Sequence, residues 1–230
     1  MFLVLQDRSR VLIDPDPRPA LVSLDPFYPI VPDTNWLARL LPRGVKLVQL
    51  RVKGQPESVV RAEIEKAIVL CAAYRCRLVI NDYWREAIEA GAGFVHLGQE
   101  DLAAADLSAI RAAGIKIGVS THNIEELEAA LAAKADYVAL GPIYATTLKA
   151  MPWPPQGLPR LAEWRSRVAC PLVAIGGITL HRAPIVLAAG ADSVAVVTDF
   201  VTSQDPDARV ENWIAATAPW RNLSTGLPQD

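Results

Sequence analysis

The chain has 230 residues and a mass of 24.9 kDa, and its 23 basic and 25 acidic residues give a formal charge of −2. This near balance excludes a strongly basic surface for nucleic acid or an anionic membrane, so we expect neither as a partner. Hydrophobic residues make up 51% and charged residues 21%, a composition that supports a large core and argues against disorder.

Short β-branched runs alternate with Ala-, Leu- and Glu-rich amphipathic stretches, which predicts repeated βα units and a parallel sheet. The predicted strands are Phe27–Val31, Lys46–Arg51, Arg77–Asn81, Phe94–Leu97, Ile115–Val119, Tyr137–Leu140, Pro171–Ile175 and Ser193–Val197. The clearest predicted helices are Glu57–Tyr74, Trp84–Ala90, Leu107–Ala113, Ile124–Ala133, Leu158–Arg167, His181–Ala189 and Asp207–Ala218. This pattern predicts the α/β class and a single (β/α)8 TIM barrel. We assign residues 27–220 to the barrel catalytic domain, 1–26 to an N-terminal extension and 221–230 to a C-terminal tail.

Four strands are preceded by turns in which a helix ends on small residues, at 43–44, 113–114, 133–136 and 189–192. Glycine accepts the left-handed conformation that ends a helix, so these turns mark the amino ends of the strands. In a parallel barrel the chemistry lies at the opposite end, directly after each strand. The residues that follow the strands are therefore the candidate site.

After the second strand, Gln49, Arg51 and Lys53 alternate along the chain and should share one side of the strand. An inward-facing polar row is costly unless it meets an anion or carboxylates. An anion site and a buried ion pair with a barrel carboxylate are both open for this row.

The third and fourth strands each deliver a carboxylate to the same rim, Asp82 and Asp101. Two hard oxygen ligands with open positions suit Mg²⁺, which takes its other ligands from water and substrate phosphates. Each aspartate alone would favour a role as a helix N-cap. Together, beside the polar row of the second strand, they favour a Mg²⁺-pyrophosphate site.

Two further strand ends carry polar or small residues. Ser120 and Thr121 end the fifth strand, where their hydroxyls suit a phosphate or, for Thr121 and Asn123, a helix cap. The long loop after the sixth strand contains Thr146 and the cation Lys149, and such loops are commonly lids or binding loops. Gly176 and Gly177 after the seventh strand, with Thr198 after the eighth, predict a phosphate cradle.

The remaining titratable residues point to no further chemistry. His96 and His122 stand at strand ends as acid/base groups or hydrogen-bonded wall residues, and we favour the second role because the metal-pyrophosphate chemistry needs no base. His181 is expected on the surface. Three cysteines without metal-type spacing, no basic leader at the N-terminus and no apolar run of ~18 residues favour a cytoplasmic protein with reduced thiols.

These motifs, in this order, make the chain resemble the thiamine-phosphate synthase family over roughly residues 27–200. The matching stretches are Val48–Lys53, Val79–Asp82, Val95–Asp101, Ile117–His122, Gly141–Tyr144 with Thr146 and Lys149, Ala174–Ile178, and Gly190 to Thr198. The resemblance implies a transferase that joins hydroxymethylpyrimidine diphosphate to carboxythiazole phosphate, giving thiamine phosphate, pyrophosphate and CO2. It leaves open whether the chain forms a homo-oligomer.

The resemblance also implies residue roles. Gln49, Arg51, Lys53, Asn81 and Lys149 would hold the pyrimidine diphosphate, with Arg51, Lys53 and Lys149 as the catalytic cations. Asp82 and Asp101 would bind Mg²⁺, and Ser120 would touch the pyrimidine. Thr146, Gly177, Val197 and Thr198 would hold the thiazole phosphate, Val197 through its backbone.

The chain departs from the family pattern at two positions. Leu148 stands in the Thr-x-Thr-Lys stretch where the family has a second threonine, so it has no hydroxyl to donate, and Thr198 replaces the usual serine. Two alternatives stay open. His122 leaves open a thiazole tautomerase-like relative, which moves a proton and needs no metal, and Leu148 leaves open a non-catalytic thiamine-phosphate-binding or regulatory protein.

Overall fold

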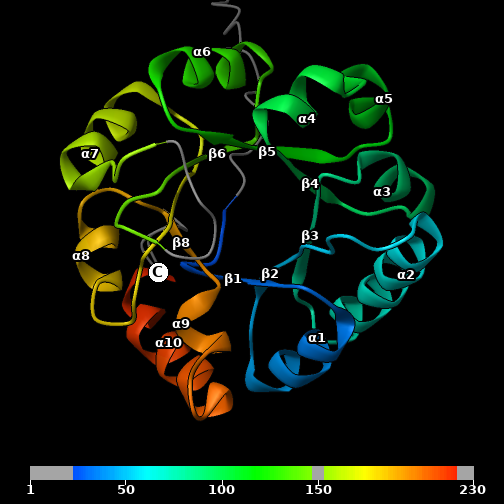
Figure 1. Cartoon of the computed structure of the whole chain (residues 1–230), viewed down its shortest axis with the longest axis horizontal. Helices are drawn as coiled ribbons and strands as arrows, with labels where there is room; N and C mark the ends of the chain where they lie inside the picture. The colour runs from blue at the N-terminus through cyan, green and yellow to red at the C-terminus, as the bar shows by residue number, and fades with distance from the viewer. Residues whose placement is uncertain (1–22, 147–152, 222–230) are drawn as a thin grey trace, which may run out of the picture.

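The computed structural model describes residues 23–146 and 153–221, and in this part of the chain eight parallel strands close into a barrel in sequence order. Helices surround the ring of strands on the outside (Figure 1). The strands are β1 Phe27–Val31, β2 Leu47–Leu50, β3 Arg77–Asn81, β4 Phe94–Leu97, β5 Lys116–Thr121, β6 Tyr137–Leu140, β7 Leu172–Ile175 and β8 Ser193–Val196. The predicted (β/α)8 class and all of its predicted strands are confirmed, with ends shifted by no more than two residues.

All seven predicted helices are present, with shifted ends, and further helices lie at 34–40, 41–43, 99–104 and 198–201. These additional helices were not predicted because such short segments carry too few turns to leave a clear period in the sequence. The longer helices are α1 Thr34–Leu40, α2 Glu57–Ala73, α3 Trp84–Ala90, α6 Ile124–Ala132, α7 Gly157–Arg167 and α10 Pro206–Arg221. The shorter ones are η1 Leu41–Arg43, α4 Gln99–Ala104, α5 Leu107–Ala112, α8 Ala183–Ala188 and α9 Thr198–Val201. His181 is exposed in the turn before α8, outside the helix predicted for it.

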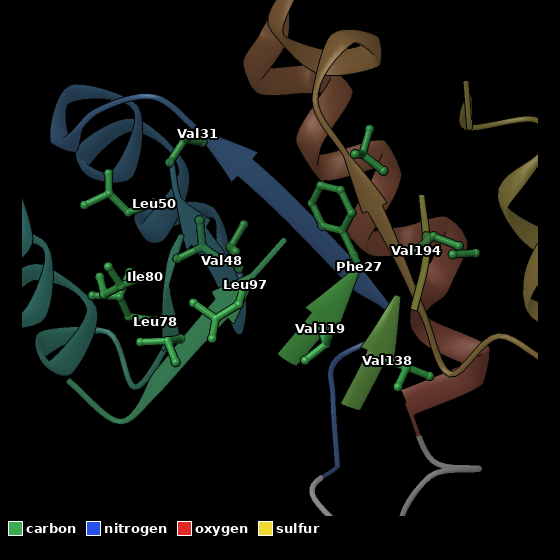
Figure 2. Close-up of a cluster of buried hydrophobic side chains, with 14 of the residues drawn as sticks. Phe27, Val31, Val48, Leu50, Leu78, Ile80, Leu97, Val119, Val138 and Val194 are labelled. Carbon is green, nitrogen blue, oxygen red and sulfur yellow. The ribbon is translucent and has the colours of Figure 1, made fainter. Parts of the chain in front are cut away.

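Alternation along each strand separates two apolar layers. Alternate strand residues such as Val48, Leu50 and Val119 face outward and pack under the helices (Figure 2). The residues between them face inward and form a second cluster inside the barrel, which includes Tyr28 and Tyr137. Gln49 of the predicted polar row belongs to the inward set, since it alternates with Leu47 of the inner cluster and bonds to Tyr28 there, whereas Lys53 is half exposed.

The turns at the amino ends of the strands follow the prediction. Gly44, Gly114 and Gly190 have φ values of 93°, 74° and 112°, in the left-handed region that glycine accepts readily. Lys134 takes the same conformation in the turn before β6, with φ 53°. At this end Arg221 of α10 also forms an ion pair with Asp25, 2.7 Å between Nε and Oδ2, which ties the last helix to the start of β1.

The described helices include none with the length and apolarity required to span a bilayer. The three assigned ranges, 1–26, 27–220 and 221–230, stay a prediction, because most of the two terminal segments lies outside the described residues.

Gly118 on β5 leaves space for the ring of Tyr137 on β6. The two residues are register partners, and a Cβ on Gly118 would lie 2.0 Å from the ring carbon that bears the Tyr137 hydroxyl. Tyr137 is fully buried, so its ring has no free volume to move into. The missing side chain at position 118 is therefore a packing requirement of the barrel interior.

We expect Gly118→Ala to lower the free energy of unfolding by about 1–3 kcal/mol, because the new methyl group overpacks the interior against Tyr137. Denaturant unfolding followed by circular dichroism measures the change. Gly93→Ala is the matched control, since a Cβ there meets nothing within 4 Å, and it should change stability by no more than about 0.5 kcal/mol. Equal losses in the two variants would contradict the packing argument.

Candidate active site

The cations predicted after β2 lie at the carboxyl end of the barrel. Gln49 is buried and donates a hydrogen bond from Nε2 to the Tyr28 hydroxyl, 3.0 Å away. Lys53 is half exposed and pairs with the carboxylate of Asp82, the residue that follows β3, so it forms an ion pair but not the buried one of the alternative. The guanidinium of Arg51 has no ion pair within the described residues.

Asp82 does not cap the helix that follows it. The N-cap of α3 is Tyr83, and no side chain accepts a hydrogen bond there. Asp82 instead takes a left-handed backbone conformation, φ 64°, and its N–H donates to the His96 carbonyl oxygen of β4 at 2.9 Å. This conformation is uncommon for a residue with a side chain and occurs often at functional sites. The N-cap alternative for Asp82 is wrong.

Asp101 is not a cap either. α4 begins earlier than its apolar residues indicated, with Gly98 as N-cap and Asp101 within the first turn. The Asp82 carboxyl raises the pKa of Asp101, so the two carboxyl groups lie close enough to interact. The aspartates that follow β3 and β4 therefore lie near each other, at the rim where the sequence predicted them.

The environment of Asp101 disfavours its negative charge. Burial raises the pKa of Asp101 above its ordinary value, the neighbouring Asp82 carboxyl raises it further, and the Lys53 ammonium partly opposes both. Two hard carboxylate ligands held against each other fit a divalent cation such as Mg²⁺. The described residues contain no cluster of three metal-ligating side chains, so a cation bound here would take its other ligands from water or a phosphate.

Asn81, the last residue of β3, carries an unsatisfied donor. Its side chain is 6% exposed, and its Nδ2 has no hydrogen-bond partner. Leaving a buried amide N–H unpaired costs about 1–3 kcal/mol, so the protein keeps this donor at a cost to stability. A bound acceptor would satisfy it.

The histidines hold structural contacts. The buried His96 lies between Tyr137, 2.9 Å from Nδ1, and Ser120, 2.8 Å from Nε2. Burial lowers the pKa of His96 to about 4, so the imidazole is neutral at physiological pH. His122 contacts Glu126 through Nδ1 at 2.7 Å and stacks on Trp153. The prediction of hydrogen-bonded wall residues describes both side chains.

The polar residues at and directly after the end of β5 separate into different roles. Thr121 is fully buried and donates to the Ala139 carbonyl oxygen at 3.0 Å, so it is a core residue and the capping alternative for it is wrong. Asn123 is the N-cap of α6 and accepts from the Glu126 N–H at 2.8 Å, as the capping alternative predicted. Ser120 alone of these three contacts His96 and faces the barrel interior.

A small-residue turn after β7 lies beside the end of β8. Gly176 and Gly177 have φ values of 95° and 63°, and a Cβ on Gly177 would lie 2.4 Å from the Ala145 carbonyl oxygen. β7 and β8 pair through Ile175 and Ala195, so Gly177 and Val197 follow at the same level of the barrel. Thr198 then opens α9, whose first N–H groups have no partner within the helix.

Part of the predicted site lies outside the described residues, namely Lys149 and the neighbouring Leu148. Other residues at the site were absent from the sequence prediction: Tyr28, Tyr137 and Gly118. The available signal was the inward position of the two tyrosines on their strands, but alternation does not reveal which side chains meet across the barrel.

The fold and the site together define a (β/α)8-barrel enzyme with its polar groups at the carboxyl ends of the strands. The family profile described as thiamine monophosphate synthase matches residues 27–200. The chain therefore belongs to the thiamine monophosphate synthase family.

Individual relatives agree with this assignment. The chain is 63% identical to a thiamine-phosphate synthase of Rhizobium etli over 203 residues, 88% of this chain and 100% of the relative. It is 50% identical to a thiamine-phosphate synthase of Escherichia coli O1:K1 over 84% of this chain and 88% of that protein. The structure of thiamine phosphate pyrophosphorylase from Pyrococcus furiosus superposes with a TM-score of 0.76 at 26% identity, covering 85% of this chain and 96% of that one.

We expect Asp101→Asn to become more stable relative to the wild type as the pH rises from about 4 to about 7. The folded-state pKa of Asp101 is raised, so ionisation of this carboxyl weakens the fold over that interval, and asparagine removes the ionisation. Urea unfolding of both proteins at several pH values, without divalent cations, measures the difference.

The matched control is Glu100→Gln, which removes an exposed carboxylate from the same first turn of α4. This variant should show no such gain, because a first-turn carboxylate is favourable near a helix N-terminus by about 0.3–1 kcal/mol. A relative loss of stability in Asp101→Asn with rising pH would refute the electrostatic account of the aspartate pair.

Proposed function

We propose that this protein is a thiamine-phosphate synthase, a transferase that joins hydroxymethylpyrimidine diphosphate to carboxythiazole phosphate and releases pyrophosphate and CO2. The observation that carries the proposal is the proximity of the Asp82 and Asp101 carboxyl groups, neither of which caps a helix, beside Lys53. The tautomerase alternative, which only transfers a proton, does not require such a set of groups for binding a diphosphate and its metal ion. The names of the Rhizobium etli and Escherichia coli relatives support the same activity.

The diphosphate end of the first substrate is assigned to the carboxyl ends of β2 and β3. Arg51, Lys53 and Lys149 supply positive charge, and the unsatisfied Nδ2 of Asn81 supplies a donor for a phosphate oxygen. Gln49 of β2 and Ser120 of β5 contact the pyrimidine. Arg51, without an ion pair among the described residues, supports this role because its charge is available to an anion.

Asp82 and Asp101 are the proposed ligands of Mg²⁺. The two carboxylates suit a hard divalent cation, and the raised pKa of Asp101 reflects a site where a cation would relieve repulsion between like charges. When bound, Mg²⁺ would neutralise negative charge on the diphosphate. The cationic side chains stabilise the charge that develops as pyrophosphate leaves.

The thiazole phosphate is assigned to the other side of the mouth. Gly177, Thr198, Thr146 and the backbone of Val197 hold it, and the left-handed turn at Gly176 and Gly177 allows close backbone approach. The electron-rich aminopyrimidine can stabilise the methylene cation left by dissociation, and the thiazole nitrogen then attacks over a short distance. The reaction requires no protein nucleophile, and the neutral, doubly hydrogen-bonded His96 is not used as a base.

We expect the wild-type protein to release pyrophosphate only when both substrates and Mg²⁺ are present. Asp82→Asn and Asp101→Asn should each lower turnover by about a hundredfold to a thousandfold, because they remove ligands that act on the leaving group. A coupled pyrophosphate assay with a Mg²⁺ titration measures both effects, and Glu100→Gln should retain wild-type turnover. Interconversion of thiazole isomers without pyrophosphate release would establish the tautomerase alternative. Binding of thiamine phosphate without any turnover would establish the regulatory alternative.

We expect Asn81→Leu to keep or raise the free energy of unfolding, by about 1 kcal/mol, because it replaces an unsatisfied buried amide with an apolar group of similar volume. The same change should weaken binding of the pyrimidine diphosphate by about tenfold to a hundredfold. Calorimetric titration and thermal unfolding measure the two effects. Asn123→Leu is the control: it removes a used N-cap and should cost about 1 kcal/mol with no change in affinity.

A further inference from the structure

Five side chains from five strands form one continuous line of hydrogen bonds across the barrel interior. Gln49 Nε2 lies 3.0 Å from the Tyr28 hydroxyl, which lies 3.0 Å from the Tyr137 hydroxyl. The line continues from Tyr137 to His96 Nδ1 at 2.9 Å and from His96 Nε2 to Ser120 Oγ at 2.8 Å. We call this set, Gln49, Tyr28, Tyr137, His96 and Ser120, the interior chain. It connects β2, β1, β6, β4 and β5.

The first link sets the direction of the chain. An amide nitrogen has no lone pair to offer, so Gln49 Nε2 donates and the Tyr28 oxygen accepts. The Tyr28 proton then needs an acceptor, and the Tyr137 hydroxyl is its partner in the described structure. Tyr28 is only 1% exposed, so a proton turned away from Tyr137 would be orphaned at a cost of about 1–3 kcal/mol.

The same accounting fixes the remaining links. Tyr137 accepts from Tyr28, so its own proton goes to His96 Nδ1. A neutral imidazole carries one proton, and with Nδ1 accepting, that proton lies on Nε2 and is donated to Ser120 Oγ. The hydroxyls of Tyr28 and Tyr137 then each donate one hydrogen bond and accept one. The Ser120 proton is left over and is available for a ligand.

Burial gives this ordering its strength. Four of the five residues are buried, with Tyr137 fully so and His96 at 8% exposure. Burial raises the pKa of Tyr28 and of Tyr137 above the ordinary value, so both phenols stay protonated. Tyr137 also stacks on the His96 ring, with centroids 5.6 Å apart, which holds the two groups in register. Hydrogen bonds in such a dry interior polarise one another and are costly to break.

We propose that Tyr28 and Tyr137 hold His96 in its Nε2–H tautomer and thereby free the proton of the Ser120 hydroxyl to donate a hydrogen bond into the mouth of the barrel. The three inner residues are positioning residues that act on substrate through Ser120. At the other end one N–H of Gln49 Nε2 donates to Tyr28, which fixes the orientation of the amide and leaves Gln49 Oε1 as an acceptor. The interior chain therefore favours a ring with an acceptor nitrogen on the Ser120 side and a donor, such as an amino group, on the Gln49 side.

The effect on substrate choice rests on the proposed function, but the tautomer does not. An aminopyrimidine offers an unprotonated ring nitrogen and an exocyclic amine. Its deaminated oxo analogue presents a carbonyl in place of the amine and carries a proton on the ring. The interior chain would thus discriminate between two rings of nearly equal shape by the direction of their hydrogen bonds.

The tautomer is tested first, on the free protein, by long-range ¹H–¹⁵N spectra of ¹⁵N-histidine-labelled chain near neutral pH. The protein has three histidines, so His96→Gln assigns the signal. We expect one species with a pyrrole-type Nε2 and a pyridine-type Nδ1. An Nδ1–H form, or an even mixture of the two forms, would overturn the proposal without any reference to catalysis.

Tyr137→Phe then breaks the chain at its centre. We expect His96 to lose its single tautomer, and the KM for the pyrimidine diphosphate to rise by about tenfold while the KM for the thiazole phosphate stays unchanged. Tyr74→Phe, at an exposed tyrosine outside the chain, is the control and should change neither. Tyr28→Phe provides a second break if Tyr137→Phe does not fold. An unchanged tautomer, or equal changes in both KM values, would contradict the proposal and leave the interior chain with a structural role only.

Failure of the proposed function is distinguishable from failure of this inference. A protein that shows the Nε2–H tautomer but makes no thiamine phosphate would retain the positioning device and lose the assigned reaction. A protein that makes thiamine phosphate with a mixed tautomer would retain the reaction and lose the device.

Discussion

Closure of the strands into a ring forces every second strand residue into a shared interior with no exit except the two ends. That constraint produces both the core and the site. Inward positions below the mouth are filled by apolar groups such as Leu47 and Val79. Higher on the same strands the inward positions are polar, Gln49 and Asn81, and they meet the mouth of the barrel. The site is thus the upper part of the same inward-facing rows.

The sequence predicts this much because strand ends are local features. Asp82 and Asp101 follow recognisable runs, so their convergence at one rim follows from the parallel topology alone. Their role depended on backbone detail that sequence does not specify. Asp82 leaves the helix-capping position because its φ is 64°, and Asp101 because α4 starts at Gln99. A start three residues later, at Leu102, would have made Asp101 the cap.

The interior chain was beyond sequence reasoning for a different reason. Tyr28 and Tyr137 are 109 residues apart, and their contact depends on the diameter of the closed barrel. It also depends on an absence, since Gly118 must lack a side chain for the Tyr137 ring to fit. A glycine within a strand indicates a close approach by some other group, but it does not name the group.

Several groups at the mouth are individually unfavourable in the free protein, which is a consistent sign of preorganisation. The aspartate pair sets like charges together, Asn81 keeps an unsatisfied donor, and Asp82 holds a left-handed backbone. Each would be satisfied or compensated by a ligand of opposite polarity: a cation, an acceptor oxygen, a diphosphate. The interior chain shows the complementary case, because its inner groups are all hydrogen-bonded and only its two end residues, Gln49 and Ser120, are left to contact a ligand at the mouth of the barrel. A rigid, saturated interior lets the few unsatisfied groups at the mouth be held in place until substrate arrives, and that arrangement fits catalysis by orientation and charge better than catalysis by a protein nucleophile.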